Sequence, residues 1–301
     1  MTAQPLTILV TGSSSGFGRV ISEELAARGH RVLATMRDVE GRNRAAAGEL
    51  EELARGPGAT LEGIELDVED DASVDRAVAR AVAGGEGIDV LVNNAGGGYL
   101  GILEAFSVEQ AQELFERNVF SVLRLNRAVL PHMRARGSGL LVHMSSGLAR
   151  FVLPFNGLYS ATKFALEAIA ETLRYELATV GVDSVIVEPG VYATGFFEKA
   201  TTAGPSDRDR IAEYAELTRL AREMGSRRPA AGDPREVAEA VAKLIELPAG
   251  SRPVRTTVGW GAQRADGLNA VSEELQQSVL DGLGVRQQLS LARQRATTTE
   301  V

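Results

Sequence analysis

The stretch Leu6–Gly18, with the sequence LTILVTGSSSGFG, decides the fold of this 301-residue chain. Its first half is a short continuous apolar run, which is typical of a strand buried on both faces of a parallel sheet. An amphipathic helical pattern follows, with Val20, Ile21 and Leu25 on one face. Glycines between the two allow a sharp turn close to a ligand, and a helix N-terminus attracts phosphate. We predict a strand, a phosphate-binding turn and a helix, although this Gly-x-x-x-Gly-x-Gly spacing alone also suits an ordinary turn.

The composition argues against several classes of protein. The formal net charge is -8 and the sequence pI is about 5.2, which disfavours binding to nucleic acid. Cysteine is absent, so disulfides and thiolate chemistry are excluded. The three histidines (His30, His132 and His143) are not at metal-ligand spacing, and we expect no metal site. Because we see no signal-like N-terminus and no uninterrupted apolar run of about 18 residues, we expect a cytoplasmic protein that does not bind membranes.

Apolar runs alternate with helical patterns along the chain. The predicted strands are Leu6–Val10, Arg31–Met36, Leu61–Leu66, Val90–Val92, Leu140–Met144, Ser184–Val187 and Val254–Val258. The predicted helices include Gly18–Arg28, Ser73–Ala83, Val108–Arg136, Tyr159–Val180 and Glu236–Leu247. This alternation predicts an α/β fold, in which a doubly wound parallel sheet is flanked by helices on both faces. Ligands of such sheets bind at the carboxyl ends of the strands.

Two regions depart from this alternation. Residues 195–233 are polar and contain a helical stretch, Ile211–Met224, and we predict that they form a substrate lid within a catalytic domain of residues 1–259. Residues 260–301 form a C-terminal extension with one amphipathic segment, Ala270–Leu283. We expect the extension to pack on the surface or on a partner subunit. The charged stretches Ala45–Glu52 and Ser206–Arg210 are interpreted as solvated surface.

The segment Tyr159-Ser160-Ala161-Thr162-Lys163 places a phenol and an ammonium four residues apart, on one face of a helix. A neighbouring cation favours the phenolate and lowers the pKa of a tyrosine. Such a tyrosine can exchange a proton with a reacting oxygen. A surface tyrosine and lysine on an amphipathic helix are the plainer interpretation of this pair by itself.

Polar residues also follow other predicted strands. Ser145 and Ser146 end the run Leu140–Met144, and either hydroxyl could bind a substrate oxygen or belong to an ordinary turn. Asn118 interrupts a helical pattern, and asparagine is a poor residue for a helix interior, so this position is a candidate functional site. His143 lies within a strand and is interpreted as a packed core residue.

Together, these motifs closely resemble the short-chain dehydrogenase/reductase family between Leu6 and Gly259. The matching motifs are Thr11–Gly18, Asn93–Gly96, Asn118, Ser146, Tyr159 with Lys163, and Pro189-Gly190. The resemblance implies a Rossmann-type domain with a catalytic tetrad of Asn118, Ser146, Tyr159 and Lys163. Ser146 is preferred because it lies 13 residues before the tyrosine, as is common in the family, and Ser145 is the alternative.

The resemblance also implies a mechanism, in which hydride passes between the C4 atom of a nicotinamide and a carbonyl or carbinol carbon. Tyr159 would then act as general acid or base, and Ser146 would hydrogen-bond the same substrate oxygen. Lys163 would contact the nicotinamide ribose and lower the pKa of Tyr159. The helix backbone at Asn118 would hold a water that links Lys163 to solvent.

The same resemblance assigns a set of residues to the cofactor. These are Gly12, Ser14, Ser15, Gly16, Phe17, Gly18, Arg37, Asp67, Val68, Asn94, Ala95, Gly96, Tyr159, Lys163, Pro189, Gly190, Val191 and Thr194. Met36 stands where NAD-dependent members commonly carry an acid, and Arg37 suits the 2′-phosphate of NADP. We therefore expect NADP(H) to be preferred and NAD(H) to be possible. A register shift of two residues would instead place Asp38 at the ribose.

Apolar residues around the motifs favour a small hydrophobic substrate. They are Leu148, Phe151, Val152, Leu153, Phe155, Leu158, Tyr192, Phe196 and Phe197, and packing in the core or at an interface is their other interpretation. The run from Leu153 to Glu167 resembles members that act on steroids and retinoids. We predict an NADP-dependent oxidoreductase that interconverts a hydrophobic ketone or aldehyde and its alcohol.

Two other activities remain in view. A catalytically silent NADP-binding sensor or scaffold of the same fold is the alternative, and a lyase or epimerase with the same tetrad is disfavoured by the compact domain. Family members usually pair through two long helices, here Val108–Arg136 and Tyr159–Val180. We therefore expect a homodimer or homotetramer.

Overall fold

The computed structural model describes residues 4–53, 60–83, 85, 87–226 and 231–291. Within them, strands in the order β3-β2-β1-β4-β5-β6-β7 form one sheet, and every pair is parallel. The strands are β1 (Thr7–Thr11), β2 (Arg31–Met36), β3 (Thr60–Glu65), β4 (Val90–Asn93), β5 (Gly139–Met144), β6 (Val182–Pro189) and β7 (Arg255–Val258). The winding reverses between β1 and β4, which is the Rossmann-type arrangement and confirms the predicted fold.

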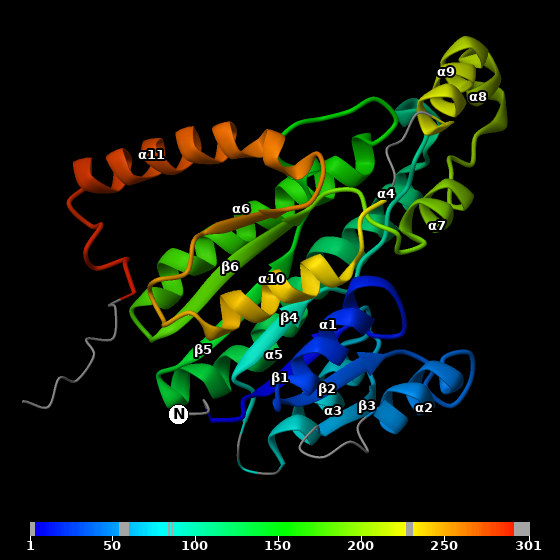
Figure 1. Cartoon of the computed structure of the whole chain (residues 1–301). Coiled ribbons are helices and arrows are strands. Elements are labelled where there is room, and N and C mark those ends of the chain that lie inside the picture. The colour runs from blue at the N-terminus through cyan, green and yellow to red at the C-terminus, as the bar shows by residue number, and fades with distance from the viewer. Residues whose placement is uncertain (1–3, 54–59, 84, 86, 227–230, 292–301) are drawn as a thin grey trace, which may run out of the picture.

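Helices cover both faces of the sheet (Figure 1). On one face, α1 (Gly16–Ala27), α2 (Arg44–Leu53) and α10 (Arg235–Glu246) bury their apolar sides against the strands. On the other face, α3 (Asp71–Val82), α5 (Ser121–Arg136) and α6 (Gly157–Ala178) do the same. Because neighbouring residues of a strand point to opposite faces, Ile8 and Val10 enter the first core and Leu9 enters the second. This double burial explains why the strands are recognisable as continuous apolar runs.

The long helix predicted for Val108–Arg136 is interrupted. It consists of α4 (Val108–Phe115), a π-helical turn over Glu116–Phe120, and α5. A π turn holds one residue more than an α turn, and here both Asn118 and Val119 are buried. The unusual residue in the helical pattern thus marks a real departure from α-helical geometry.

The predicted lid is mostly helical. It contains α7 (Phe196–Thr202), α8 (Arg208–Glu213) and α9 (Ala215–Ser226), and residues 227–230 lie outside the described part. In Figure 1, α8 and α9 project beyond the sheet, whereas α7 lies nearer to it. Two hydrogen bonds join this region to the rest of the chain. The backbone amide of Leu100 donates to the carbonyl of Ala200 at 3.2 Å, and the side-chain amide of Gln110 donates to the carbonyl of Gly204 at 3.1 Å.

The C-terminal extension contains a short 3-10 turn (Ala262–Ala265) and α11 (Asp266–Gly282), which lies across α6 (Figure 1). Polar side chains hold α11 to the rest of the chain: Asn269 donates to Glu188 at 2.8 Å, and Tyr175 donates to Gln276 at 3.3 Å. Aliphatic side chains at its helical spacing are instead between 48% and 68% exposed; they are Leu268, Val271, Leu275, Val279 and Leu283. The amphipathic helix that the sequence predicts is present, but its apolar stripe faces outward. Residues 292–301 of the extension lie outside the described part.

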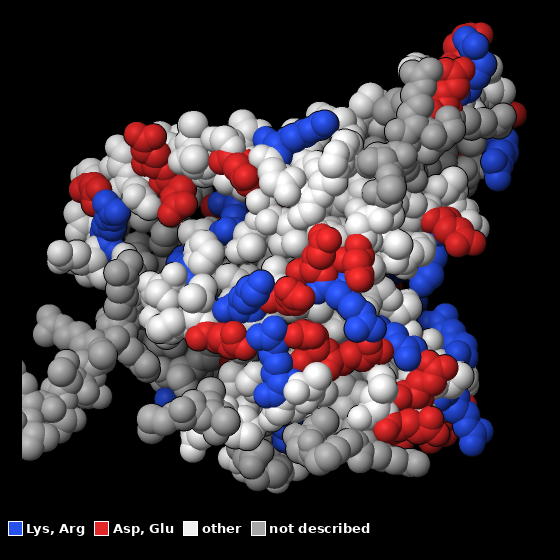
Figure 2. Space-filling model, viewed as in Figure 1, with Lys and Arg blue, Asp and Glu red and all other residues white. Residues whose placement is uncertain are grey.

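The surface carries charges of both signs. Figure 2 shows acidic and basic side chains interspersed over α1, α2 and α10, without a broad patch of one sign on this face. Among the described residues, no helix is long and apolar enough to cross a membrane. No group of three or more potential metal ligands occurs among the described residues either.

Candidate active site

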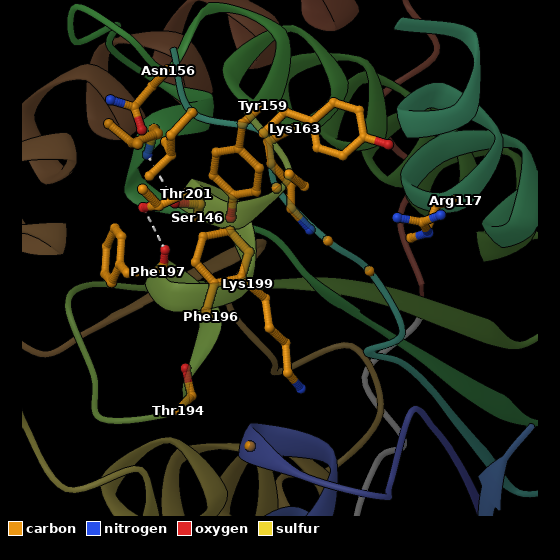
Figure 3. A pocket seen from close by; sticks show the side chains of 18 of the residues that line it. Arg117, Ser146, Asn156, Tyr159, Lys163, Thr194, Phe196, Phe197, Lys199 and Thr201 are labelled. Carbon is orange, nitrogen blue, oxygen red and sulfur yellow. Dashed lines mark hydrogen bonds between the residues drawn. The ribbon is translucent and has the colours of Figure 1, made fainter. Parts of the chain in front are cut away.

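A cavity of about 1320 Å³ lies at the carboxyl ends of the strands. The residues that line it come from the turn after β1, the ends of β2 to β6, the segment between β5 and α6, and the predicted lid. Figure 3 shows Tyr159, Lys163 and Ser146 on one side of this space and Phe196, Phe197 and Lys199 of α7 on the other. Residues far apart in the sequence therefore meet at one site, as the topology requires.

The glycine-rich turn forms one end of the cavity. Gly12 has a φ of +71°, a conformation that side chains disfavour, and it lies against Asn94 and Ala95 at the end of β4. The Thr11 hydroxyl accepts the amides of Asn94 and Ala95, each at 2.9 Å, and so joins the ends of β1 and β4. The turn and this strand end thus make one backbone-lined cradle, which fits a phosphate group at the N-terminus of α1.

The cavity collects almost all of the residues predicted to bind the cofactor. Those that line it are Gly12, Ser14, Ser15, Gly16, Phe17, Arg37, Asp67, Val68, Asn94, Ala95, Gly96, Tyr159, Lys163, Pro189, Gly190, Val191 and Thr194. Gly18 is the exception, because it is buried behind the turn. A Cβ at Gly18 would lie 2.4 Å from the carbonyl oxygen of Gly12, so this glycine is needed for packing of the turn.

Tyr159 and Lys163 lie on α6 and are both buried. The Lys163 ammonium donates to the carbonyl of Met144, at the end of β5, at 2.8 Å. It lies 5.8 Å from the centre of the Tyr159 ring. The helix and the strand end are thereby joined directly beside the phenol.

Burial controls the ionisation of this pair. Removal from water raises the pKa of Tyr159 to about 12, and the interaction with Ser146 opposes that rise only in part. Burial also lowers the pKa of Lys163 to about 8, while Glu167 acts in the opposite direction. Burial therefore has the largest effect on the phenol, and the lowering of the Tyr159 pKa by Lys163, whose ammonium is bonded to Met144, stays a prediction.

The two serines after β5 are in different surroundings. Ser145 also lines the cavity, but its hydroxyl donates to the carboxylate of Glu167 at 2.7 Å. Ser146 accepts the amide of Leu148 at 3.2 Å and lies beside the phenol of Tyr159. Figure 3 shows the Tyr159 ring pointing toward Ser146. Of the two hydroxyls, the geometry favours that of Ser146 as a partner for an oxygen bound at Tyr159.

Asn118 organises the backbone between β4 and the cavity. Its amide group accepts from the Gly97 amide and donates to the Gly97 carbonyl, both at 2.9 Å. It also donates to the hydroxyl of Thr162 at 2.9 Å, one residue before Lys163. The side chain is thus fully used in joining the π turn, the glycine-rich segment Gly96–Gly98 and α6.

The end of β2 carries the residues predicted to choose the cofactor. Arg37 lines the cavity, its side chain is 45% exposed, and one guanidinium nitrogen lies 3.9 Å from the carboxylate of Asp67. Asp38 has a φ of +55°, and its carboxylate accepts the amide of Arg42 at 3.0 Å. Arg42 and Asn43, which the sequence analysis missed, line the cavity next to Arg37, whereas Asp38 does not. This arrangement favours Arg37 over Asp38 as the residue nearer to the cavity, and the choice between them stays a prediction.

Helix α7, the first helix of the predicted lid, packs against Tyr159. The ring of Phe196 packs 5.2 Å from that of Tyr159, centre to centre, and a Cβ at Gly98 would lie 2.4 Å from it. Lys199, also missed in the sequence, donates to the hydroxyl of Ser15 in the glycine-rich turn at 3.3 Å. One turn of α7 thus contacts both ends of the cavity.

Two other residues singled out in the sequence, Tyr192 and His143, pack against the rest of the protein. Tyr192 packs edge-on against Phe17, and its hydroxyl donates to Glu236 at 2.8 Å, so only part of it faces the cavity. His143 is fully buried, and burial lowers its pKa to about 3, so the ring is neutral. This neutral, buried state agrees with the interpretation of His143 as a core residue.

Comparison with known proteins agrees with this site. The short chain dehydrogenase family matches residues 6–204, and the chain belongs to that family. The chain is similar to retinol dehydrogenase 8 of Bos taurus, with 37% identity over 261 residues, or 81% of this chain and 79% of that protein. It is also similar to human 17-beta-hydroxysteroid dehydrogenase type 1, with 37% identity over 250 residues, or 80% of this chain and 74% of that protein.

A solved structure extends the comparison. An alcohol dehydrogenase from Thermococcus sibiricus, complexed with 5-hydroxy-NADP, is 27% identical and superposes with a TM-score of 0.69. The alignment covers 87% of this chain and 99% of that chain. Family and relatives together make this chain an NAD(P)-dependent oxidoreductase.

Proposed function

We propose that this protein interconverts a hydrophobic ketone or aldehyde and its alcohol, with NADP as cofactor and Tyr159 as general acid and base. The observation that carries the proposal is the buried phenol of Tyr159, which lies beside Ser146 at the wall of one cavity. Apolar side chains surround that point, among them Leu148, Phe151 and Phe196. The similar retinol and 17-beta-hydroxysteroid dehydrogenases are named for hydrophobic alcohols, which supports the substrate class.

The choice of NADP rests on Arg37. Its guanidinium stands at the end of β2, where the second ribose of a dinucleotide lies in this fold, and it suits a phosphate. Asp38, the nearest acid in sequence, is turned toward Arg42 and leaves Arg37 without a competing ribose ligand. The similar alcohol dehydrogenase bound to 5-hydroxy-NADP supports the same preference.

The residues of the chain then take the following roles. Backbone of the turn Gly12–Gly16 and the N-terminus of α1 holds the pyrophosphate. When bound, the nicotinamide supplies or accepts the hydride. Ser146 donates a hydrogen bond to the substrate oxygen, and Tyr159 gives that oxygen a proton in reduction or removes one in oxidation. Lys163 places a positive charge beside the phenol. Asn118 fixes the backbone at Gly97 and bonds to Thr162, the residue before Lys163.

Turnover by a phenylalanine variant tests this assignment. NADPH oxidation is followed with a panel of hydrophobic ketones and aldehydes, and Tyr159→Phe should lower kcat by at least about 10³-fold because the proton source is lost. NADPH binding, followed by fluorescence, should change less than about threefold, since the ring remains. Substantial turnover in the variant contradicts the proposal, and NADPH binding without turnover of any panel member by the parent favours the silent sensor or scaffold.

We also propose that two copies pair through α5 and α6. Phe120, which directly precedes α5, Leu123 of α5 and Phe164 of α6 are 47%, 38% and 42% exposed, which is unusual for large apolar side chains. Gel filtration with light scattering should give a dimer or tetramer, and Phe164→Glu should shift it toward the monomer. A monomeric parent protein at micromolar concentration contradicts this proposal.

The cytoplasmic location expected from the sequence stays a prediction.

A further inference from the structure

Behind the catalytic residues lies a cluster of buried charged side chains that the proposed mechanism does not use. Glu167, Glu188 and Arg255 are each at most 5% exposed as side chains. The Arg255 guanidinium lies 2.9 Å from the carboxylate of Glu167, 2.7 Å from that of Glu171 and 3.4 Å from that of Glu188. Burial of charge on this scale is costly, so its position directly behind the site calls for an explanation.

Within the cluster, Glu167 is the member that reaches the catalytic residues. It lies one helical turn after Lys163 on α6, so the two side chains share a face. Its carboxylate accepts the hydroxyl of Ser145 at 2.7 Å, and the amide of Ser145 donates to the carbonyl of Val187 at 2.7 Å. The residue that precedes Ser146 is therefore held by α6 on one side and by β6 on the other.

The charges around Glu167 come from every element packed on it. Lys163 and Glu171 lie on its own helix, Arg150 approaches to 3.8 Å, Glu188 comes from β6 and Arg255 from β7. Burial and the nearby Glu167 raise the pKa of Glu188 to about 8, which favours the protonated form of Glu188. His143, which faces Lys163 from β5, stays neutral and adds no charge.

We propose that Glu167 is a positioning residue for the proposed oxidoreductase chemistry, which holds Ser145 at the end of β5 and keeps the Lys163 ammonium charged beside Tyr159. This inference rests on the proposed function, because it assigns Glu167 a task through Lys163 and Ser146. Glu167 does not line the cavity and touches neither substrate nor cofactor. The amide of Asn269, which donates to Glu188 at 2.8 Å, links the same cluster to α11.

The charge of Lys163 can be measured without turnover, because the chain has only three lysines: Lys163, Lys199 and Lys243. Protein labelled with 13C and 15N in lysine gives one side-chain NMR signal for each, and Lys199→Arg and Lys243→Arg assign them. In Glu167→Gln, which removes the charge and keeps the size, Lys163 should titrate about one pH unit or more below the parent. Glu171→Gln is the matched control, since it removes a carboxylate from the same helix and the same Arg255. It should shift the titration by less than about 0.3 units.

Kinetics supply the second readout. The alkaline limb of the kcat profile for ketone reduction should move to lower pH in Glu167→Gln together with the NMR titration, and should stay in place in Glu171→Gln. If Glu167→Gln does not fold, Glu167→Asp decides: it should keep the titration of Lys163 within about 0.3 units of the parent while kcat falls, because the shorter arm releases Ser145.

The inference is overturned if a folded Glu167→Gln variant keeps the Lys163 titration and the pH profile of kcat of the parent. It is also overturned if Glu167→Asp keeps the kcat of the parent. A parent protein without turnover, in which the titration of Lys163 still depends on Glu167, contradicts the proposed function instead.

Discussion

Replacing Arg37 by glutamine tests the cofactor preference at the residue that the geometry singles out. The guanidinium is about half exposed, and the carboxylate of Asp67 lies 3.9 Å from it. A hydrogen bond to a charged group contributes about 1.5–3 kcal/mol when formed in a protected site, and two charges 4 Å apart contribute about 1 kcal/mol in water. Because Arg37 is partly solvated, we expect a loss of about 1–2 kcal/mol, which is roughly 5- to 30-fold in affinity for NADPH.

The assay compares dissociation constants for NADPH and NADH by fluorescence titration at low and at high salt. Arg37→Gln should weaken NADPH alone, and the difference from the parent should shrink at about 1 M salt because exposed charges are screened. Arg42→Gln, on the same rim but 3.9 Å from the carboxylate of Asp38, is the matched control and should have a smaller effect. Equal weakening of NADPH and NADH by Arg37→Gln, or no change in either, would refute the reasoning.

Three further predictions concern the lid and the buried acids. Phe196→Ala removes the ring 5.2 Å from that of Tyr159 and should raise the substrate KM about 2- to 12-fold in steady-state kinetics; an unchanged KM would show that the ring does not help to hold substrate. Lys199→Gln should weaken NADPH binding about 2- to 5-fold at low salt, by titration, because its exposed ammonium adds positive charge at the turn; an effect that persists undiminished in high salt contradicts this. Burial and Glu167 raise the pKa of Glu188 to about 8 from its ordinary 4.5, so its proton is held more tightly in the folded state and stability falls as pH rises between these values. Glu188→Gln should flatten that fall in Tm, measured by scanning fluorimetry from pH 5 to 9, and a decline parallel to the parent's refutes it.

The sheet could be predicted from the sequence because each strand is buried on both faces and therefore appears as a continuous apolar run. The ends of the observed strands lie within two residues of the predicted ones, and the pairing of the strands adds their order in the sheet. Helix α7, within the predicted lid, was not predicted. It is only seven residues long, and contacts with distant residues such as Gly98 stabilise it more than any periodic pattern of its own.

The proximity of Tyr159 and Lys163 was predictable because they are neighbours on one helix, which is a local relation. Their pKa values were not predictable, because burial shifts both of them and burial depends on the packing of the whole domain. Lys199 was missed for a similar reason, since only the path of the chain between β6 and α7 brings it to Ser15.

The C-terminal helix shows a third limit of prediction from the sequence. Its sequence pattern gives an apolar stripe but not the direction in which the stripe faces. Asn269 and Gln276 make the hydrogen bonds that attach α11, so its polar edge faces inward and side chains such as Leu275 face outward.

Because of the π turn at Glu116–Phe120, the relative orientation of α4 and α5 depends on the number of residues between them. One extra residue in a helix rotates everything after it by about 100° relative to an uninterrupted helix. Deleting a single residue here would restore regular α geometry, and α4 and α5 would no longer present their buried sides together. Asn118 would turn away from Gly97 and Thr162, although no catalytic group had been replaced. The active site therefore depends on a count of residues as well as on their chemistry.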